Sequence, residues 1–284
     1  MGLNPLTSKN QHMKKVVVVF DGHHFSQGAF DFVRQLNEKE RILVTGLFLP
    51  VVDYAELLYS LGGLTGPAYY SDIAFEDMGV IQQNISHFKA QCKEYNIEYN
   101  LHPDLSRHVI SEIKFQSRFA DLMVLSSELF YENLGKDLQE DYLENVLHKA
   151  ECPVVLVPEH YGFPSNVILA YDGSESSVHA IKQFAYLLPE FTNLKTLLVS
   201  AVKDSDIPDV KYIEEFAQCH FKDLTIKKLQ IDPKVYFSSW LSDHGRSVLV
   251  TGAYGRSALS ELLKRSFITQ AIQDHKVPIF VAHK

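Results

Sequence analysis

The sequence has little of what marks a secreted, membrane-spanning or nucleic-acid-binding protein. Only three of its 284 residues are cysteines, and none forms a CxxC pair, which is typical of proteins of the reducing cytoplasm. No apolar run approaches the roughly 20 residues that cross a bilayer, and the opening residues lack the apolar segment of a signal peptide. A formal net charge of −8 argues against general binding to nucleic acid or anionic membranes. We therefore expect a cytoplasmic protein with no nucleic-acid and no membrane partner.

Common catalytic and metal-binding motifs are missing as well. The chain has no Walker GxxxxGK[ST], no HExxH and no GxSxG, so no catalytic residue is assigned. His23 and His24 follow Asp21 closely, but adjacent side chains rarely converge on one ion, and the usual spacing of zinc ligands is absent. We expect no metal site there.

What the chain does have is a repeat. LMVLSSELFYENLGKDLQEDYLENVLHKAECPVVLV around Pro153 aligns without a gap with SVLVTGAYGRSALSELLKRSFITQAIQDHKVPIFVA around Pro278, and VVVVFDG ending at Gly22 matches VILAYDG ending at Gly173. Such self-similarity indicates two copies of one unit. We expect the units at 13–158 and 166–284, with their boundary in the segment PEHYGFPSN between them.

Short, continuous apolar runs alternate with segments of helical spacing in both units. Continuous apolar strands are buried on both faces, as in a parallel sheet covered by helices, and the alternation predicts an α/β, doubly wound fold. Strands are expected at 16–20, 42–49, 121–126, 153–157, 167–171, 196–202, 247–251 and 278–282. Helices are expected around 29–36, at 76–95 and 105–117, after a capping Ser174, and at 208–219, 234–244 and 267–274.

The last strand of each unit begins with a proline, Pro153 or Pro278. Proline is tolerated at the start of a strand or on a sheet edge, and an edge needs its backbone groups covered. We hypothesise that the two closing strands pair across a pseudo-twofold axis, so that one chain forms a pseudo-dimer. A monomer or a dimer of tandem chains is then expected.

The first unit carries an additional segment near 51–76 that is rich in glycine and tyrosine. It is a structural elaboration that packs locally, a lid, or a surface for an unknown protein partner. The residue pattern does not choose between these.

Candidate ligand-binding residues follow two strands of the second unit. Asp172 comes directly after the first strand, where a carboxylate can accept hydrogen bonds from a base or a ribose; alternatively it holds a turn or caps the next helix. Gly252 and Gly255 allow backbone amides to approach a phosphate. Arg265 and Ser266 precede an expected helix N-terminus, which favours anions. The alternative for these four is a glycine-rich turn followed by a solvated arginine.

Together these residues carry a resemblance. NVILAYDGSESSVHAIKQFAYLL is similar to the first strand, Asp-Gly-Ser turn and first helix of the universal stress protein family. GAYGRSALSELLKRSFITQAIQDHKVPIFVA is similar to its nucleotide segment, a Gly-x-x-Gly, nine residues, then Gly-Ser or Gly-Thr. Gly252, Gly255 and Ser266 match, and Arg265 stands where the family usually has glycine. The resemblance is weak over 15–158 and good over 166–284, so the chain looks like a tandem member.

The resemblance implies two Rossmann-like domains, each a five-stranded parallel sheet of the adenine-nucleotide alpha hydrolase-like type, and a role in stress tolerance. It implies binding of ATP or another adenine nucleotide, with or without Mg²⁺. Asp172 would lie near adenine and ribose, and Ala170 stands where a proline often lines the base pocket. Gly252 and Gly255 would cradle ribose and phosphates, and Ser266 would donate to a phosphate.

Arg265 leaves two possibilities for phosphate binding: its side chain fills the phosphate space, or its guanidinium pairs with the phosphates. The first unit departs further. Ser127 and Phe130 replace the two glycines, and Glu140 and Asp141 replace the arginine and serine. Each carboxylate close to a polyphosphate would repel it by about 1 kcal/mol or more. We expect no nucleotide in the first unit.

The leading hypothesis is a stress-response protein that binds an adenine nucleotide in its C-terminal unit and acts as a sensor or regulator. No residue is placed as a general base for a γ-phosphate, so at most slow ATPase activity is expected. The alternative is a nucleotide-free interaction or scaffold module that uses the segment near 51–76.

Overall fold

The computed structural model describes residues 13–21, 24–49, 70–101, 109–128, 146–200, 206–230, 233–252, 274 and 276–282. Ten strands are present in them. The first five are β1 (Lys14–Asp21), β2 (Ile42–Leu49), β3 (Glu98–Leu101), β4 (Leu122–Ser126) and β5 (Val154–Val157). The second five are β6 (Asn166–Ala170), β7 (Lys195–Ser200), β8 (Asp223–Lys228), β9 (Ser247–Gly252) and β10 (Ile279–Ala282).

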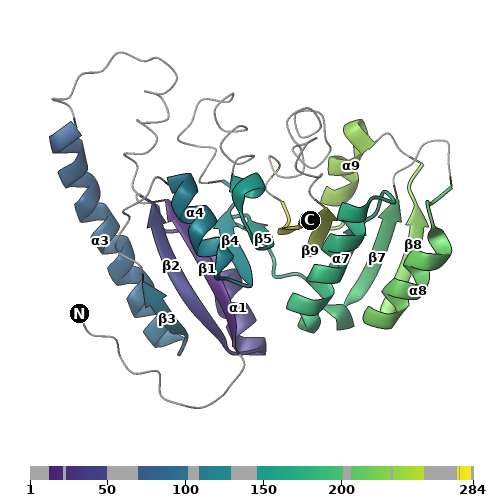
Figure 1. Ribbon diagram of the computed structural model, residues 1–284, viewed down its shortest axis with the longest axis horizontal. Coiled ribbons are helices and arrows are strands. Elements are labelled where there is room, and N and C mark those ends of the chain that lie inside the picture. Colours follow the sequence, from purple (N-terminus) through teal and green to yellow (C-terminus); the bar gives the residue numbers. More distant parts are fainter. Residues whose placement is uncertain are drawn as a thin grey trace.

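All ten strands belong to one sheet with the order β3-β2-β1-β4-β5-β10-β9-β6-β7-β8 (Figure 1). Every neighbouring pair is parallel except β5 and β10, which are antiparallel. Each half therefore repeats one doubly wound order around its own first strand, β1 or β6. The predicted α/β fold with two five-stranded parallel units is confirmed.

The helices cover the sheet on both sides. They are α1 (Gln27–Lys39), α3 (Tyr70–Glu94), α4 (Val109–Arg118), α7 (Glu175–Leu187), α8 (Val210–His220) and α9 (Pro233–Ser242), with a 3₁₀ turn η2 at Pro189–Asn193. No described helix is both long enough and apolar enough to span a membrane. α3 starts at Tyr70, inside the additional segment near 51–76; the rest of that segment, and nearly all of the expected helix at 267–274, lie outside the described residues.

The closing strands pair as hypothesised. In the antiparallel ladder between β5 and β10, Phe280 lies opposite Val155, with the neighbouring pairs in register on either side. Both strands are fully buried. Each would otherwise be an open edge of a five-stranded sheet. Their pairing therefore satisfies the backbone N–H and C=O groups of both edges and makes one continuous sheet.

The sequence analysis did not predict two of the strands, β3 and β8. They are the outermost strands, and along β8 exposed and half-buried residues alternate strictly. An edge strand covered on one face shows this period-two pattern instead of a continuous apolar run. The search for continuous runs therefore found only the eight inner strands.

The register of the repeat also needs a correction. The gapless alignment makes Ser127 the counterpart of Gly252. In the structure Leu122 pairs with Val16 and Val248 pairs with Val167, and these first-strand residues match in VVVVFDG and VILAYDG. Leu122 of β4 is therefore the counterpart of Val248 of β9, an offset one residue larger than that of the gapless alignment. With this offset, Ser126 is the counterpart of Gly252. A one-residue shift turns every side chain to the other face, and in the corrected register Leu122 and Val124 face the same core as their counterparts Val248 and Val250.

Two apolar cores lie on the two faces of the sheet. One packs under α1, α3, α7 and α8 and runs through both halves; the other packs under α4 and α9. Across the middle of the first core, the Phe32 ring stacks on Phe191 with centroids 6.4 Å apart, and Phe163 from the connecting segment lies against both rings. The two halves therefore share core as well as sheet.

Candidate functional site

The predicted site residues meet where β6 and β9 end. These two strands are parallel neighbours, with Leu169 paired to Val250, so Asp172, just after β6, and Gly252, the last residue of β9, lie at the same edge of the sheet. Ala170 closes β6, is 8% exposed, and packs in the core on the α9 side. The structure thus brings together three of the six predicted residues. Gly255, Arg265 and Ser266 lie outside the described residues.

Asp172 shapes the turn between β6 and α7. Its Oδ1 accepts a hydrogen bond from the Ser174 backbone N–H at 2.9 Å, and the residue is exposed. Gly173 has φ +86°, a conformation that side chains rarely adopt. Ser174 then caps α7, as predicted, because its Oγ accepts from the Ser177 N–H at 3.1 Å. The turn-holding alternative for Asp172 is therefore part of its role.

Gly252 has a packing role. A Cβ at this position would lie 2.4 Å from the backbone carbon of Ser176 and 2.6 Å from the Ser177 nitrogen. Glycine is needed because the end of β9 meets the backbone of the first turn of α7. This close approach explains the glycine without any ligand.

The end of the neighbouring strand, β7, already takes part in a backbone hydrogen bond. The Ser200 carbonyl, at the end of β7, accepts from the Leu229 N–H at 2.9 Å. The resemblance in the sequence implies a backbone contact to adenine from near Ser200 or Ala201, and Ala201 lies outside the described residues. Within the described part of the chain, no group of three or more His, Cys, Asp or Glu is arranged to hold a metal ion.

The corresponding end of the first half holds one of the protein's own carboxylates. Glu159, in the connecting segment, accepts from the Gly28 backbone N–H through Oε2 at 3.1 Å, in the first turn of α1. The Glu159 N–H in turn donates to Glu128 at 2.9 Å. A helix N-terminus attracts anions, and here an internal carboxylate already lies on it.

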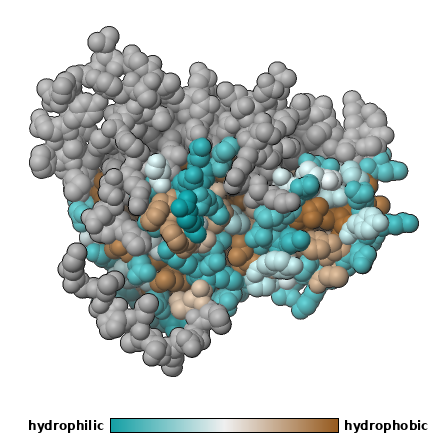
Figure 2. All heavy atoms as spheres, viewed as in Figure 1, coloured by the Kyte–Doolittle hydropathy of each residue, from teal (hydrophilic) through white to brown (hydrophobic). Residues whose placement is uncertain are grey.

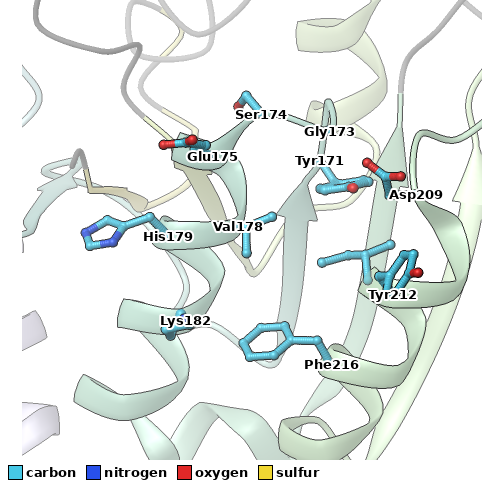
Figure 3. A pocket seen from close by; sticks show the side chains of 11 residues that line it. Tyr171, Gly173, Ser174, Glu175, Val178, His179, Lys182, Asp209, Tyr212 and Phe216 are labelled. Carbon is cyan, nitrogen blue, oxygen red and sulfur yellow. The ribbon is translucent and has the colours of Figure 1, made fainter.

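Sequence reasoning missed a cavity of about 600 Å³ between α7 and α8. Figure 2 shows apolar side chains gathered on this part of the surface, and Figure 3 shows the residues that line the cavity. Tyr171 lies at its inner end, with its hydroxyl donating to the Pro208 carbonyl at 3.0 Å. Burial raises the pKa of Tyr171, and the charges of Asp209 and Asp172 raise it further. The available sequence signal was an aromatic pair, Tyr212 and Phe216, one helical turn apart.

Known structures share this architecture. A universal stress protein from Archaeoglobus fulgidus DSM 4304 superposes with a TM-score of 0.67 over 95% of this chain and 96% of that protein, at 13% sequence identity. The chain has the universal stress protein fold. A universal stress protein solved in complex with cAMP aligns with 43% of this chain and 98% of its own length, at a TM-score of 0.34 and 17% identity. No family model and no curated protein matches the chain.

The match to the Archaeoglobus protein extends over both halves, so the universal stress protein fold is present here in its tandem form. At this level of identity the likeness concerns the fold. What this chain binds must be argued from its own residues.

Proposed function

We propose that this chain is a tandem universal stress protein that binds ATP or another adenine nucleotide at the carboxyl ends of β6 and β9. The observation that carries the proposal is the position of Asp172 and Gly252. β6 lies between β7 and β9 in the sheet, and the chain leaves it toward β7, whereas β9 is reached on its other side. In open α/β sheets, ligands bind at this point of reversal, beyond the carboxyl ends of the strands.

The described residues suit the polar end of a nucleoside. The exposed Asp172 carboxylate accepts hydrogen bonds, as a ribose hydroxyl or an adenine amino group requires. Its own turn is already formed, so binding costs little reorganisation at this side chain. Gly255, Arg265 and Ser266 are proposed to hold the phosphates, with Arg265 as a guanidinium partner.

The first half is proposed to bind no nucleotide. Glu159 lies on the first turn of α1, and Glu128 lies next to it, so an incoming phosphate would meet negative charge instead of free amides. One nucleotide per chain follows. Because Asp172 is engaged in its turn, the site is proposed to bind and position the nucleotide, with at most slow hydrolysis. The proposed role is that of a sensor or regulator in a stress response.

Isothermal titration of ATP, with and without Mg²⁺, tests the proposal in the full chain and in Asp172→Asn. Asparagine keeps an oxygen for the Ser174 N–H, so the turn is retained while the charge is lost. We expect one site per chain and about tenfold weaker binding in the variant, the effect of losing one hydrogen bond to a charged group. Gly255→Glu should abolish binding.

Matched controls lie in the first half. Asp21→Asn changes the equivalent aspartate, and Phe130→Ala changes the residue that the gapless sequence alignment sets against Gly255; both should bind ATP like the unmodified chain. Absence of heat at millimolar ATP, in protein shown by mass spectrometry to carry no ligand, would overturn the proposal. Equal losses in Asp172→Asn and Asp21→Asn would do so too.

A second candidate is a protein-interaction module without nucleotide. It is favoured by the length of α3, 25 residues against 11 for α8, the helix at the equivalent place in the second half. Figure 1 shows α3 extending beyond the ends of its neighbouring strands. Replacing residues 51–69 by a short Gly-Ser linker tests it: this function predicts loss of a co-purifying partner, and the nucleotide function predicts unchanged ATP binding.

A further inference from the structure

The cavity between α7 and α8 borders the proposed nucleotide site, because Gly173 and Ser174, which follow Asp172 in its turn, belong to the cavity lining. Consecutive strand residues point to opposite faces. Ala170 packs in the core under α9, and Tyr171, the next residue, packs in the core under α7 and α8. A ligand in the α7–α8 cavity would therefore contact Tyr171 and not Ala170, so the body of the cavity lies on the other face of the sheet from Ala170.

The body of the cavity is apolar. Tyr171 and Ile213 at its floor are 4% and 3% exposed, and Val178 lies beside them on α7 (Figure 3). Phe216 and Tyr212 form the α8 side, where the Tyr212 ring is 77% exposed. A volume of about 600 Å³ and an apolar lining with a few polar groups are typical of pockets for small ligands.

One end of the cavity is negative. Asp209 is the N-cap residue of α8, in the left-handed conformation with φ 46° and ψ 35°, and its side chain makes no capping hydrogen bond. A non-glycine residue in this region is uncommon, and Asp209 forgoes the usual capping role. Its carboxylate points instead to the upper end of the cavity, near Tyr171 (Figure 3).

The other end is positive. The Lys182 Nζ lies 5.9 Å from the centroid of the Phe216 ring, within the range of a cation–π contact. Lys182 is eight residues beyond Ser174, the N-cap of α7, which corresponds to roughly 12 Å along the helix. Asp209 lies at the N-terminal end of α8, so the two charges are separated by most of the length of the apolar groove.

We propose that this groove binds a short linear zwitterion with an apolar body, of the size and class of a tripeptide with free termini. Its ammonium group pairs with Asp209 and its carboxylate with Lys182. Three extended residues span roughly 10 Å, which is close to the roughly 12 Å along α7 from Ser174 to Lys182. The apolar side chains of such a ligand lie against Ile213, Val178 and Phe216.

Calorimetric titration of the tripeptide Leu-Phe-Ala into the full chain tests the proposal. The same peptide with an acetylated N-terminus or an amidated C-terminus removes one charge at a time. We expect saturable binding of the free peptide, weakened about twofold to fivefold by either block, as for partly exposed ion pairs. Asp209→Asn removes the proposed partner of the ammonium group, so this variant should bind the acetylated and the free peptide equally well. Lys182→Gln removes the proposed partner of the carboxylate, so it should bind the amidated and the free peptide equally well.

Two tyrosine variants locate the site. Tyr212→Ala removes an exposed wall of the groove and should weaken binding of the free peptide several-fold. Tyr236→Ala removes a tyrosine of similar exposure, 57%, from α9 on the other face and should change nothing. No saturable binding at millimolar peptide, equal affinity for free and blocked peptides, or equal effects of the two tyrosine variants would overturn the proposal.

The test is independent of the proposed nucleotide function. Asp209, Lys182 and Tyr212 are not assigned to the nucleotide site, so ATP titrations of these variants should match those of the unmodified chain. Loss of peptide binding with intact ATP binding, or the reverse, therefore separates the failure of one proposal from the failure of the other.

Discussion

Gly252 lies so close to the first turn of α7 that a Cβ added to it would come within 2.4 Å of the backbone carbon of Ser176. The contact joins the end of β9 to the helix that follows β6. Both elements border the proposed nucleotide site. The glycine that the sequence assigns to phosphate binding therefore also allows β9 and α7 to pack closely beside that site.

The first prediction concerns this contact. Gly252→Ala should lower the free energy of unfolding by about 2 kcal/mol, because a side chain forced against backbone must displace it. Urea denaturation measures the effect. Gly79→Ala is the matched control: Gly79 lies in α3 with open space around its Cβ position, and alanine there should raise stability by roughly 0.5–1 kcal/mol. An unchanged midpoint in Gly252→Ala would contradict the packing role.

The second prediction concerns the shared core. Phe191 is 1% exposed and contacts both Phe32 of the first half and Phe163 of the connecting segment. Phe191→Ala should cost about 3–5 kcal/mol. The whole chain should still unfold in one transition, because β5 and β10 join both halves into one sheet.

Two signals test this cooperativity. Fluorescence of Trp240, the single tryptophan, reports the second half, and far-ultraviolet circular dichroism reports the whole chain. Their unfolding curves should coincide. Separate transitions would show that the halves unfold independently. As a control, Phe119→Ala at a 57% exposed position should stay within about 0.5 kcal/mol of the unmodified chain.

The third prediction concerns Glu190, which lies at the junction of the halves near Lys14 and Glu40. Burial raises the pKa of Glu190 above its ordinary value of 4.5, while a backbone hydrogen bond and then the charge of Lys14 act in the opposite direction. Its Oε2 is buried with no hydrogen-bond partner among the described residues. The folded state therefore holds the proton more tightly than the unfolded state, and stability is lost as pH rises through the raised pKa.

Glu190→Gln should accordingly be more stable than the unmodified chain at pH 7. The difference should disappear below about pH 4.5, where the carboxyl is protonated in both states. Thermal unfolding between pH 4 and 8 measures this. Glu98→Gln, at an exposed position in β3, should show no such pH-dependent gain. A stability loss in Glu190→Gln at pH 7 would mean that the backbone hydrogen bond and the attraction to Lys14 together outweigh the cost of burial.

The fourth prediction concerns the thiols. Cys92 and Cys152 are buried, and burial raises the pKa of each to about 12, whereas Cys219 is exposed. The thiolate is the reactive form. At pH 8 a thiol reagent should label Cys219 quickly and the other two only after denaturation. Cys219→Ser should remove the fast phase; a fast phase that persists would show that a buried cysteine is accessible.

Several features could be read from the sequence because they depend on local composition. The inner strands appear as continuous apolar runs because both of their faces are buried. Ser174 caps α7 where the sequence places it. The paired closing strands follow from the prolines that open them. β3 and β8 could not be read this way, since one covered face leaves an alternating pattern.

The sequence by itself determined the repeat, the fold class and the edge of the sheet where Asp172 and Gly252 meet, because periodicity and composition encode which faces are buried. Tertiary structure alone decided three features. They are the one-residue change of register that makes Ser126 the counterpart of Gly252 in the repeat, the contact of Gly252 with Ser176, and the groove between α7 and α8 with its charged ends. These depend on residues that are distant in the chain and close in space, and local patterns do not specify such distances.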